Sequence, residues 1–308
     1  MTCYGKRLAH SGQTEQAYVA AKQETLLTSA LPAFARNIAA AFFTREPHLA
    51  MSQPVRIVFF TNATTHESLP VLKALSESEQ VEILQVVLYN RVPISLGRLR
   101  ARIRQHGLKR TLSNVANGIA AKLAAPTSDS NSGTSTSRTY AEDNNLPIRQ
   151  VTSVNSPDVL QYMRTLQPDL FVVCALSEII KPDLLQVPRL TAINVHPSLL
   201  PKYRGPAPVF WALYHREAET GITFHAIDSR IDNGAIIDQF RVPLHPNAPL
   251  DDVTRQLFSI AGEHIVNAVV GVGRDEKEFS PQKKEDATYF SMPSLAQRQE
   301  LSRRTTTQ

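Results

Sequence analysis

The stretch "INVHPSLLPKYRGPAP", from Ile193 to Pro208, follows an apolar run and carries four prolines, one glycine, one histidine and two basic residues. Proline fixes φ and lacks a backbone donor, so neither a regular helix nor a regular strand accommodates the mixture after His196. We therefore predict a strand that ends near Asn194 and His196, followed by a shaped loop. In α/β proteins, loops at the ends of buried strands hold the chemistry.

Apolar runs on both sides of this stretch alternate with helical patterns. The predicted strands cover residues 55–61, 81–89, 146–152, 168–175 and 189–195, and the predicted helices cover 66–78 and 156–167. Strands that are apolar throughout and separated by helices are typical of a parallel sheet covered on both faces. The predicted fold class is α/β, with a Rossmann-like open, mostly parallel sheet and helices on both faces.

The chain divides into a leader, one α/β domain and a tail. Residues 1–50 are alanine-rich and weakly amphipathic, and the α/β pattern begins only after Met51. We expect 1–50 to be a disordered or non-native leader; an organellar transit peptide is the alternative, although its glutamates are atypical of such peptides. The domain covers 51–290, with a basic helical insertion at 91–123 and a flexible linker at 124–145. We expect a disordered tail at 291–308.

Composition limits the compartment. The chain has 308 residues and only two cysteines, Cys3 and Cys174, which argues against a disulfide scaffold and fits a reducing compartment. Its apolar runs are shorter than the roughly 20 residues that span a bilayer. We expect a cytoplasmic protein with no transmembrane segment, and the sequence does not indicate its oligomeric state.

The positive charge is concentrated in the insertion. Of a net charge of +5, residues 91–123 supply eight basic side chains and no acid, so the rest of the chain carries −3. The eight are Arg91, Arg98, Arg100, Arg102, Arg104, Lys109, Arg110 and Lys122. Such a segment is either a solvated face or a contact for an anionic acceptor or an anionic membrane surface.

Three polar side chains are predicted to meet at the end of the last parallel strand. The period of two along a strand puts Asn194 and His196 on the same side. An amide donor beside an imidazole suits acyl chemistry, because the amide stabilises an oxyanion and the imidazole moves a proton. Downstream, Asp228 and Asp232 can orient the histidine, and a tight turn at 232–234 between two β-like runs would return Asp232 to the strand ends.

The segments that carry these residues resemble the folate-dependent formyltransferases. The resemblance rests on "NVHPSLLPKYRGPAP" (194–208) and "ETGITFHAIDSRIDNGAI" (219–236), and it extends to "PDLFVVCALSEIIKPDLL" (168–185) and "PQKKEDATYF" (281–290). This family includes methionyl-tRNA, glycinamide ribonucleotide and amino-sugar formyltransferases, which act in one-carbon metabolism. Its catalytic trio maps onto Asn194, His196 and Asp232.

The resemblance implies a donor, 10-formyltetrahydrofolate, and residues that hold it. Asn194 would bind the developing oxyanion, His196 would move protons and Asp232 would hold His196, with no metal required. The residues implied to bind the donor are Leu176, Ser177, Ile179, Ile180 and Asp228, and those implied to bind the acceptor are Ser198 and Arg204. Ala175 stands where family members often have glycine. His225 is interpreted as a structural histidine more readily than as a substrate contact.

The acceptor is predicted by elimination. Methionyl-tRNA formyltransferases carry a further domain after the Ala-Thr-Tyr stretch, and only 291–308 follow it here. We therefore expect no tRNA-binding domain. A small or sugar-linked amine, such as an amino-sugar nucleotide, is a more favoured acceptor than tRNA. The residues "TNATTHES" (61–68) contain no glycine, so a phosphate-binding loop is not evident after the first strand. Two alternatives remain open: a formyltetrahydrofolate hydrolase, and a catalytically silent homologue that binds folate or a partner.

Overall fold

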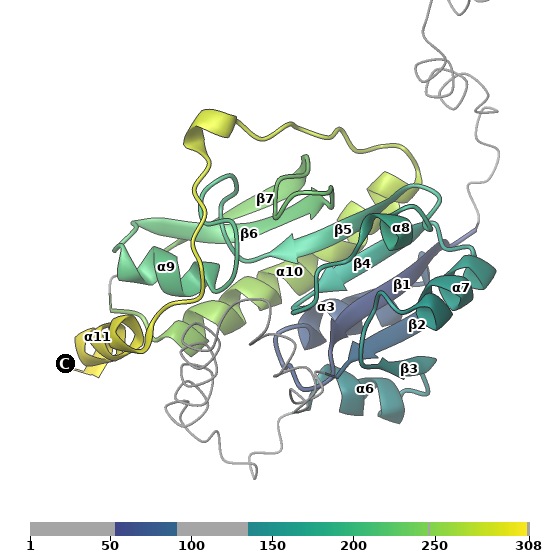
Figure 1. Ribbon diagram of the computed structural model, residues 1–308, viewed down its shortest axis with the longest axis horizontal. Coiled ribbons are helices and arrows are strands. Elements are labelled where there is room, and N and C mark those ends of the chain that lie inside the picture. The colour runs from purple at the N-terminus through teal and green to yellow at the C-terminus, as the bar shows by residue number, and fades with distance from the viewer. Residues whose placement is uncertain (1–52, 91–134, 246, 307–308) are drawn as a thin grey trace, which may run out of the picture. The chain divides into compact units, whose positions relative to one another are not determined.

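The computed structural model describes residues 53–90, 135–245 and 247–306, and Figure 1 draws the ribbon. The leader at 1–50 and the basic insertion at 91–123 lie outside these residues, as does the linker up to residue 134. Expectations for those segments therefore stay predictions. The elements described below belong to the unit that begins at Pro54.

One seven-stranded sheet organises the described chain, in the order β3-β2-β1-β4-β5-β6-β7. Its strands are β1 (Val55–Asn62), β2 (Val81–Tyr89), β3 (Ile148–Val151), β4 (Leu170–Cys174), β5 (Thr191–His196), β6 (Glu219–Ala226) and β7 (Ile236–Pro243). Strands β1 to β5 pair in parallel, whereas β6 runs antiparallel to both β5 and β7. The predicted Rossmann-like, mostly parallel α/β fold is confirmed.

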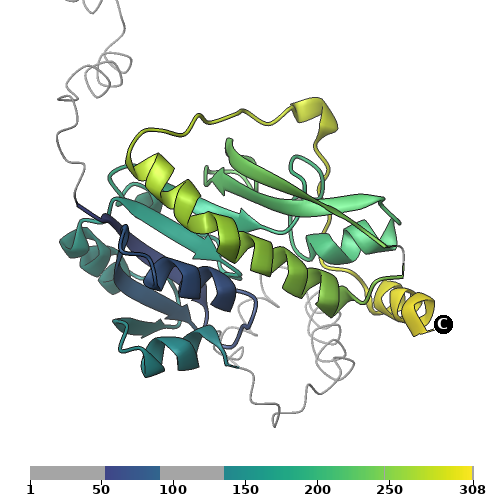
Figure 2. The same ribbon diagram turned by 180° about the vertical axis from the view of Figure 1, so that it is seen from behind.

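Helices cover both faces of the sheet. Helices α3 (Leu69–Ser76) and α10 (Leu250–Gly273) lie across one face, which Figure 2 shows from that side, and α7 (Pro157–Leu166) and α8 (Pro182–Leu185) cover the other. Successive side chains of a strand therefore pack alternately into two hydrophobic cores, one on each face of the sheet. On β5, Ile193 and Val195 belong to the core under α3 and α10, and Ala192 to the core under α7 and α8.

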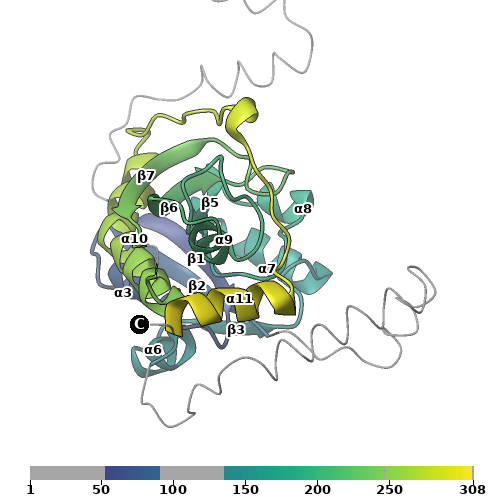
Figure 3. The ribbon, with the colours of Figure 1, turned by 90° about the vertical axis from the view of Figure 1, so that its left-hand side faces the viewer.

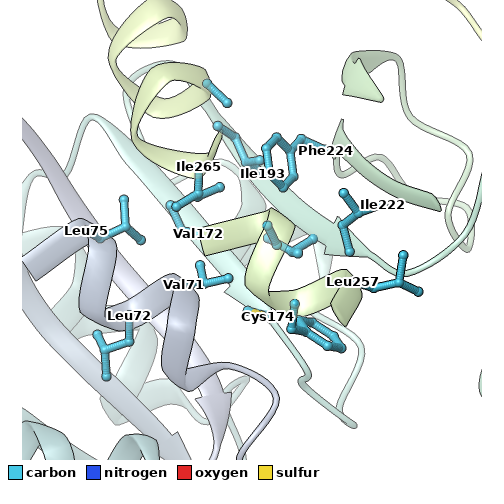
Figure 4. Close-up of a cluster of buried hydrophobic side chains, with 14 of the residues drawn as sticks. Val71, Leu72, Leu75, Val172, Cys174, Ile193, Ile222, Phe224, Leu257 and Ile265 are labelled. Carbon is cyan, nitrogen blue, oxygen red and sulfur yellow. The ribbon is translucent and has the colours of Figure 1, made fainter. Parts of the chain in front are cut away.

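Helix α10 was not predicted, although its sequence has the periodicity of an amphipathic helix. Buried residues Val253, Leu257, Ala261 and Ile265 follow one another at intervals of four, which places them on one face of a helix. Figure 4 shows Leu257 and Ile265 among the side chains of α3, β4, β5 and β6. The helix thus closes the core beneath the parallel and the antiparallel halves of the sheet.

Part of the predicted flexible linker is ordered, which corrects that expectation for residues 135–145. Helix α6 (Ser137–Asp143) begins with a capping box in which Thr136 and Thr139 each bond the other's backbone N–H. Ser137 is buried, and its hydroxyl lies 2.7 Å from that of Ser68. The polar composition that suggested a linker therefore supplies caps and tertiary hydrogen bonds.

The tail is ordered as well, so the expectation of a disordered segment at 291–308 is wrong for residues 295–306. Helix α11 (Leu295–Thr306) packs beside α9 (Pro208–Tyr214), as Figure 3 shows from the end of the sheet. The Tyr214 hydroxyl donates to Glu300, Arg304 donates to the Tyr214 carbonyl, and Leu301 is only 5% exposed. Tertiary packing stabilises a segment that is too polar to fold alone.

Candidate active site

The end of β5 carries Asn194 and His196, between β4 and β6 in the sheet. Asn194 is half-buried and the His196 side chain is 6% exposed. Because Ile193 and Val195 point into the core under α10, Asn194 and His196 project from the opposite face, as the alternation predicted. Strand order reverses between β1 and β4, and ligands of open α/β sheets bind near such a reversal, beyond the carboxyl ends of the strands.

Asp232 reaches this strand end from the connection between β6 and β7. That connection spans residues 227–235, so the tight turn expected at 232–234 is the tip of a longer loop. The Oδ1 atom of Asp232 lies 3.5 Å from Asn194 Nδ2, 3.8 Å from His196 Nδ1 and 3.7 Å from His225 Nε2. Its Oδ2 atom accepts the Gly205 N–H at 2.8 Å. Three side-chain nitrogens thus surround one carboxylate oxygen.

A backbone carbonyl defines the tautomer of His196. Its Nε2 lies 3.1 Å from the carbonyl oxygen of Tyr203, and because a carbonyl only accepts, Nε2 carries the proton in the neutral ring. The lone pair is then on Nδ1, the nitrogen that faces Asp232. His196 can therefore accept a proton at Nδ1 beside a carboxylate, which stabilises the imidazolium that forms.

The carbonyl of Tyr203 is itself held by the segment that precedes α11. Thr288 accepts the Tyr203 N–H on its hydroxyl and the Arg204 N–H on its carbonyl, and the Phe290 N–H donates back to Arg204. The Tyr203 hydroxyl donates to Glu217, and burial, with this bond, raises the pKa of Tyr203 well above its usual value. Residues 288–290 thereby brace the loop that orients His196.

His225, interpreted above as a structural histidine more readily than as a substrate contact, is buried with a partner at each ring nitrogen and belongs to the same cluster. It is 1% exposed and lies opposite Asn194 in the β5–β6 register, with Nε2 3.1 Å from Asn194 Nδ2. Its Nδ1 lies 2.8 Å from the carbonyl oxygen of Ala226. Burial first, and then the neighbouring charge of His196, lower the pKa of His225 to about 4, against the opposing effect of Asp232.

The loop after β4 is rigidly held beside the strand ends. Ser177 donates from both its N–H and its hydroxyl to Asn62 at the end of β1, and the Glu178 carboxylate accepts from Ser153, Val154 and Asn155. Ala175, at the position where the resemblance implied a glycine, adopts φ +52°, a conformation that glycine takes without steric cost.

The residues of this loop that were predicted to bind the donor differ in exposure. Ile179 is 71% exposed, and Leu176 is partly buried. Ile180 is buried in the core under α7 and α8, so its side chain packs in the protein interior.

The other residues predicted to bind the donor or the acceptor form hydrogen bonds within the protein. Ser198 is fully buried and its hydroxyl donates to the Lys202 carbonyl, so the structure gives it a turn-stabilising role instead of an acceptor contact. Asp228 accepts from the Arg230 N–H and the Asn233 amide inside the 227–235 loop. A half-buried Arg204 donates to Asn233 and Gln282.

Within the described ranges, neither a metal-binding cluster nor a membrane-spanning helix is present. In 53–90, 135–245 and 247–306, His, Cys, Asp and Glu form no group of three or more that could hold a metal ion. Within the same ranges, every helix is too short or too polar to cross a membrane.

The chain belongs to the formyl transferase family, whose model matches residues 55–269. Two curated relatives are methionyl-tRNA formyltransferases. That of Chloroflexus aggregans is 40% identical over 147 residues, 48% of each chain, and that of Trichormus variabilis is 30% identical over 239 residues, 77% of this chain and 61% of the other. The chain thus spans about half the length of the relatives it matches first.

Solved structures share the fold. A sugar 3N-formyltransferase, WlaRD, crystallised in the presence of dTDP and 5-N-formyl-THF, superposes with a TM-score of 0.52 at 19% identity over 78% of this chain and 70% of the other. A phosphoribosylglycinamide formyltransferase from Bacillus halodurans gives 0.51 at 16% identity over 70% and 94%. At these identities the likeness establishes the fold alone, and it agrees with the family assignment from the sequence.

Proposed function

We propose that the protein transfers the formyl group of 10-formyltetrahydrofolate to an amine. The observation that carries the proposal is the convergence of Asn194, His196 and Asp232 at the end of β5. Membership of the formyl transferase family supports the same chemistry, and WlaRD, a relative in fold, was crystallised with a formylated folate.

Each side chain has one task in the transfer. The donor supplies an activated formyl carbon, which the acceptor nitrogen attacks. Asn194 donates its amide N–H to the formyl oxygen as negative charge develops there. Nδ1 of His196 takes the proton that the attacking amine loses and delivers it to the departing N10 atom of the folate as the C–N10 bond breaks. Asp232 stabilises the imidazolium between these two events. The products are a formamide and tetrahydrofolate.

The loop after β4 is proposed to bind the donor. Its rigid backbone, from Ala175 to Ile180, lies at the carboxyl end of the strand next to β5, and the exposed Ile179 side chain offers an apolar surface for a pterin ring. Asp228, in the loop that carries Asp232, is proposed to contribute a polar contact to the same ring. Arg204 lies on the loop that follows His196, on the side proposed for the acceptor.

The test is a transfer assay with the full-length protein and 10-formyltetrahydrofolate, in which the absorbance of released tetrahydrofolate is recorded. One arm contains nucleotide-linked amino sugars, a second contains methionyl-tRNA and a third contains no amine. Formamide in either amine arm, absent with the His196→Ala variant, supports the transferase. Tetrahydrofolate with formate in the third arm, unaffected by amines, would instead identify a hydrolase.

A further inference from the structure

The amide of Asn194 can be placed in two orientations, related by a half-turn that exchanges its nitrogen and oxygen. The chemistry proposed for Asn194 needs the NH2 group in the site, because only the nitrogen donates to a developing oxyanion. The neighbours of the amide decide between the two orientations. Those neighbours are the Nε2 atom of His225 at 3.1 Å and the Oδ1 atom of Asp232 at 3.5 Å.

His225 presents a lone pair to this amide. The carbonyl of Ala226, 2.8 Å from Nδ1, accepts and cannot donate, so the proton of the neutral ring resides on Nδ1. Nε2 is therefore an acceptor, and its partner on Asn194 must be the NH2 group. In the reversed orientation the amide oxygen would face the Nε2 lone pair and the Asp232 carboxylate, and both contacts are repulsive.

We propose that His225 is a positioning residue that, through the Nδ1–H tautomer fixed by the Ala226 carbonyl, holds the amide of Asn194 with its NH2 group toward the reacting formyl oxygen. This role rests on the proposed formyl transfer. One hydrogen of the NH2 group bonds to Nε2. The other points toward Asp232 at 3.5 Å, a long contact that can be exchanged for the oxyanion.

The neutral state of His225 is part of this arrangement. A protonated ring would carry a hydrogen on Nε2, lose its bond from Asn194 and attract Oδ1 of Asp232, 3.7 Å away, in competition with His196. The titratable groups that face the ring are His196, Asp232 and Asp228. Burial and the proximity of His196 outweigh the two carboxylates and keep the pKa of His225 low.

The experiment compares His225→Leu, which removes the acceptor, with His225→Gln, whose side-chain oxygen can replace Nε2 as acceptor. We expect kcat to fall by about 10- to 100-fold for the leucine variant and by less for the glutamine variant, since loss of a whole oxyanion donor costs about 10²–10³. Affinity for 5-formyltetrahydrofolate, measured by calorimetry, should stay at the wild-type value. The matched control is His245→Leu at an exposed histidine, with unchanged kcat.

A double-mutant cycle separates positioning from a general structural effect. If His225 acts through Asn194, adding His225→Leu to Asn194→Ala should lower kcat little further. Effects that multiply in the double variant, or a glutamine variant no better than the leucine variant, would overturn the proposal.

A readout without turnover keeps this inference distinct from the proposed function. Long-range ¹H–¹⁵N spectra of histidine-labelled protein at pH 7 should identify the Nδ1–H tautomer for His225. The side-chain NH2 resonances of Asn194 should shift in His225→Leu and stay in place in His245→Leu. An Nε2–H tautomer would refute the positioning role even in a fully active enzyme. The expected tautomer in a protein that formylates no amine would refute the proposed function alone.

Discussion

Oδ1 of Asp232 lies 3.8 Å from Nδ1 of His196, while Oδ2 of the same carboxylate accepts the backbone N–H of Gly205 at 2.8 Å. The second bond ties Asp232 to the loop that follows His196. The first distance is too long for a direct hydrogen bond but short enough for strong charge stabilisation. Asp232 is thus anchored by one oxygen and faces the proposed base with the other.

Removing either partner of this pair should abolish most turnover without unfolding the protein. We expect His196→Ala and Asp232→Asn each to lower kcat by about 10²–10⁴-fold, the usual cost of losing a positioned general acid or base. Asp232→Asn keeps an oxygen for Gly205 and so should leave the loop in place. Steady-state kinetics with circular dichroism checks both points, and near-wild-type turnover in either variant would remove that residue from the mechanism.

Acid should destabilise the protein through His225. Its pKa is about 4 in the folded state and 6.5 ordinarily, so between these values the unfolded chain binds the proton and the folded chain does not. Stability therefore falls as pH falls from 6.5 to 4, by about 2 kcal/mol between pH 7 and pH 5 from this group. Urea unfolding at both pH values measures the change. His225→Gln should reduce the change in unfolding free energy between the two pH values, and His245→Gln should not. The same change in the wild type and in both variants would contradict the low pKa of His225.

The sequence predicted the parallel sheet because its signal is local. The runs at 55–61, 81–89 and 189–195 are mostly apolar, and each contains a largely buried strand. The period of two along a strand predicted that Asn194 and His196 project from the same face of the sheet. The register between strands is not local, so the pairing of His225 with Asn194 across β5 and β6 could not be read from the sequence.

Long-range contacts also explain why the order of the tail and of part of the linker was not predicted from the sequence. Polar composition predicted disorder in both, because an isolated polar segment buries too little apolar surface. The partners that order them lie far away in sequence: Ser291 accepts the indole N–H of Trp211, and Ser137 meets Ser68 in the interior. Composition alone cannot reveal such partners.

Gly234 should tolerate no side chain. A Cβ atom at this position would lie 1.7 Å from the carbonyl oxygen of Ala226, the atom that fixes the tautomer of His225. We expect Gly234→Ala to lower the free energy of unfolding by about 1–3 kcal/mol. Displacement of the loop should also lower kcat by about 10-fold or more, because small misplacements of catalytic groups are costly.

Ser229→Ala, an exposed change in the same loop, is the control for Gly234→Ala and should match the wild type. The comparison needs chemical denaturation and kinetics on both variants. Wild-type kinetics in Gly234→Ala would show that the loop adapts without moving Asp232.

Docking of the tail helix should contribute measurably to stability. Leu301 is 5% exposed and belongs to the main core cluster. Truncation of a buried leucine removes apolar burial and leaves a cavity, so Leu301→Ala should cost about 2 kcal/mol. Gln299→Ala, on the exposed side of the same helix, should change stability by less than about 0.5 kcal/mol. Equal unfolding midpoints for both variants would mean that α11 does not pack on the domain in solution.

Replacing Ala175 by glycine should stabilise the protein, although glycine usually destabilises. Ala175 has φ +52°, where a Cβ atom approaches the following carbonyl, and relief of that contact is worth about 1–2 kcal/mol. The added flexibility of the unfolded chain offsets part of this gain, which leaves about 0.5–1 kcal/mol. Ala218→Gly, at an exposed residue outside the left-handed region, should instead lose about 0.5–1 kcal/mol. Thermal unfolding of both variants measures these opposite changes in stability.

Glycine at position 175 keeps the path of the loop after β4, so the affinity for 5-formyltetrahydrofolate should stay the same in Ala175→Gly. A loss of both stability and affinity would show that the alanine methyl group itself packs in the donor site.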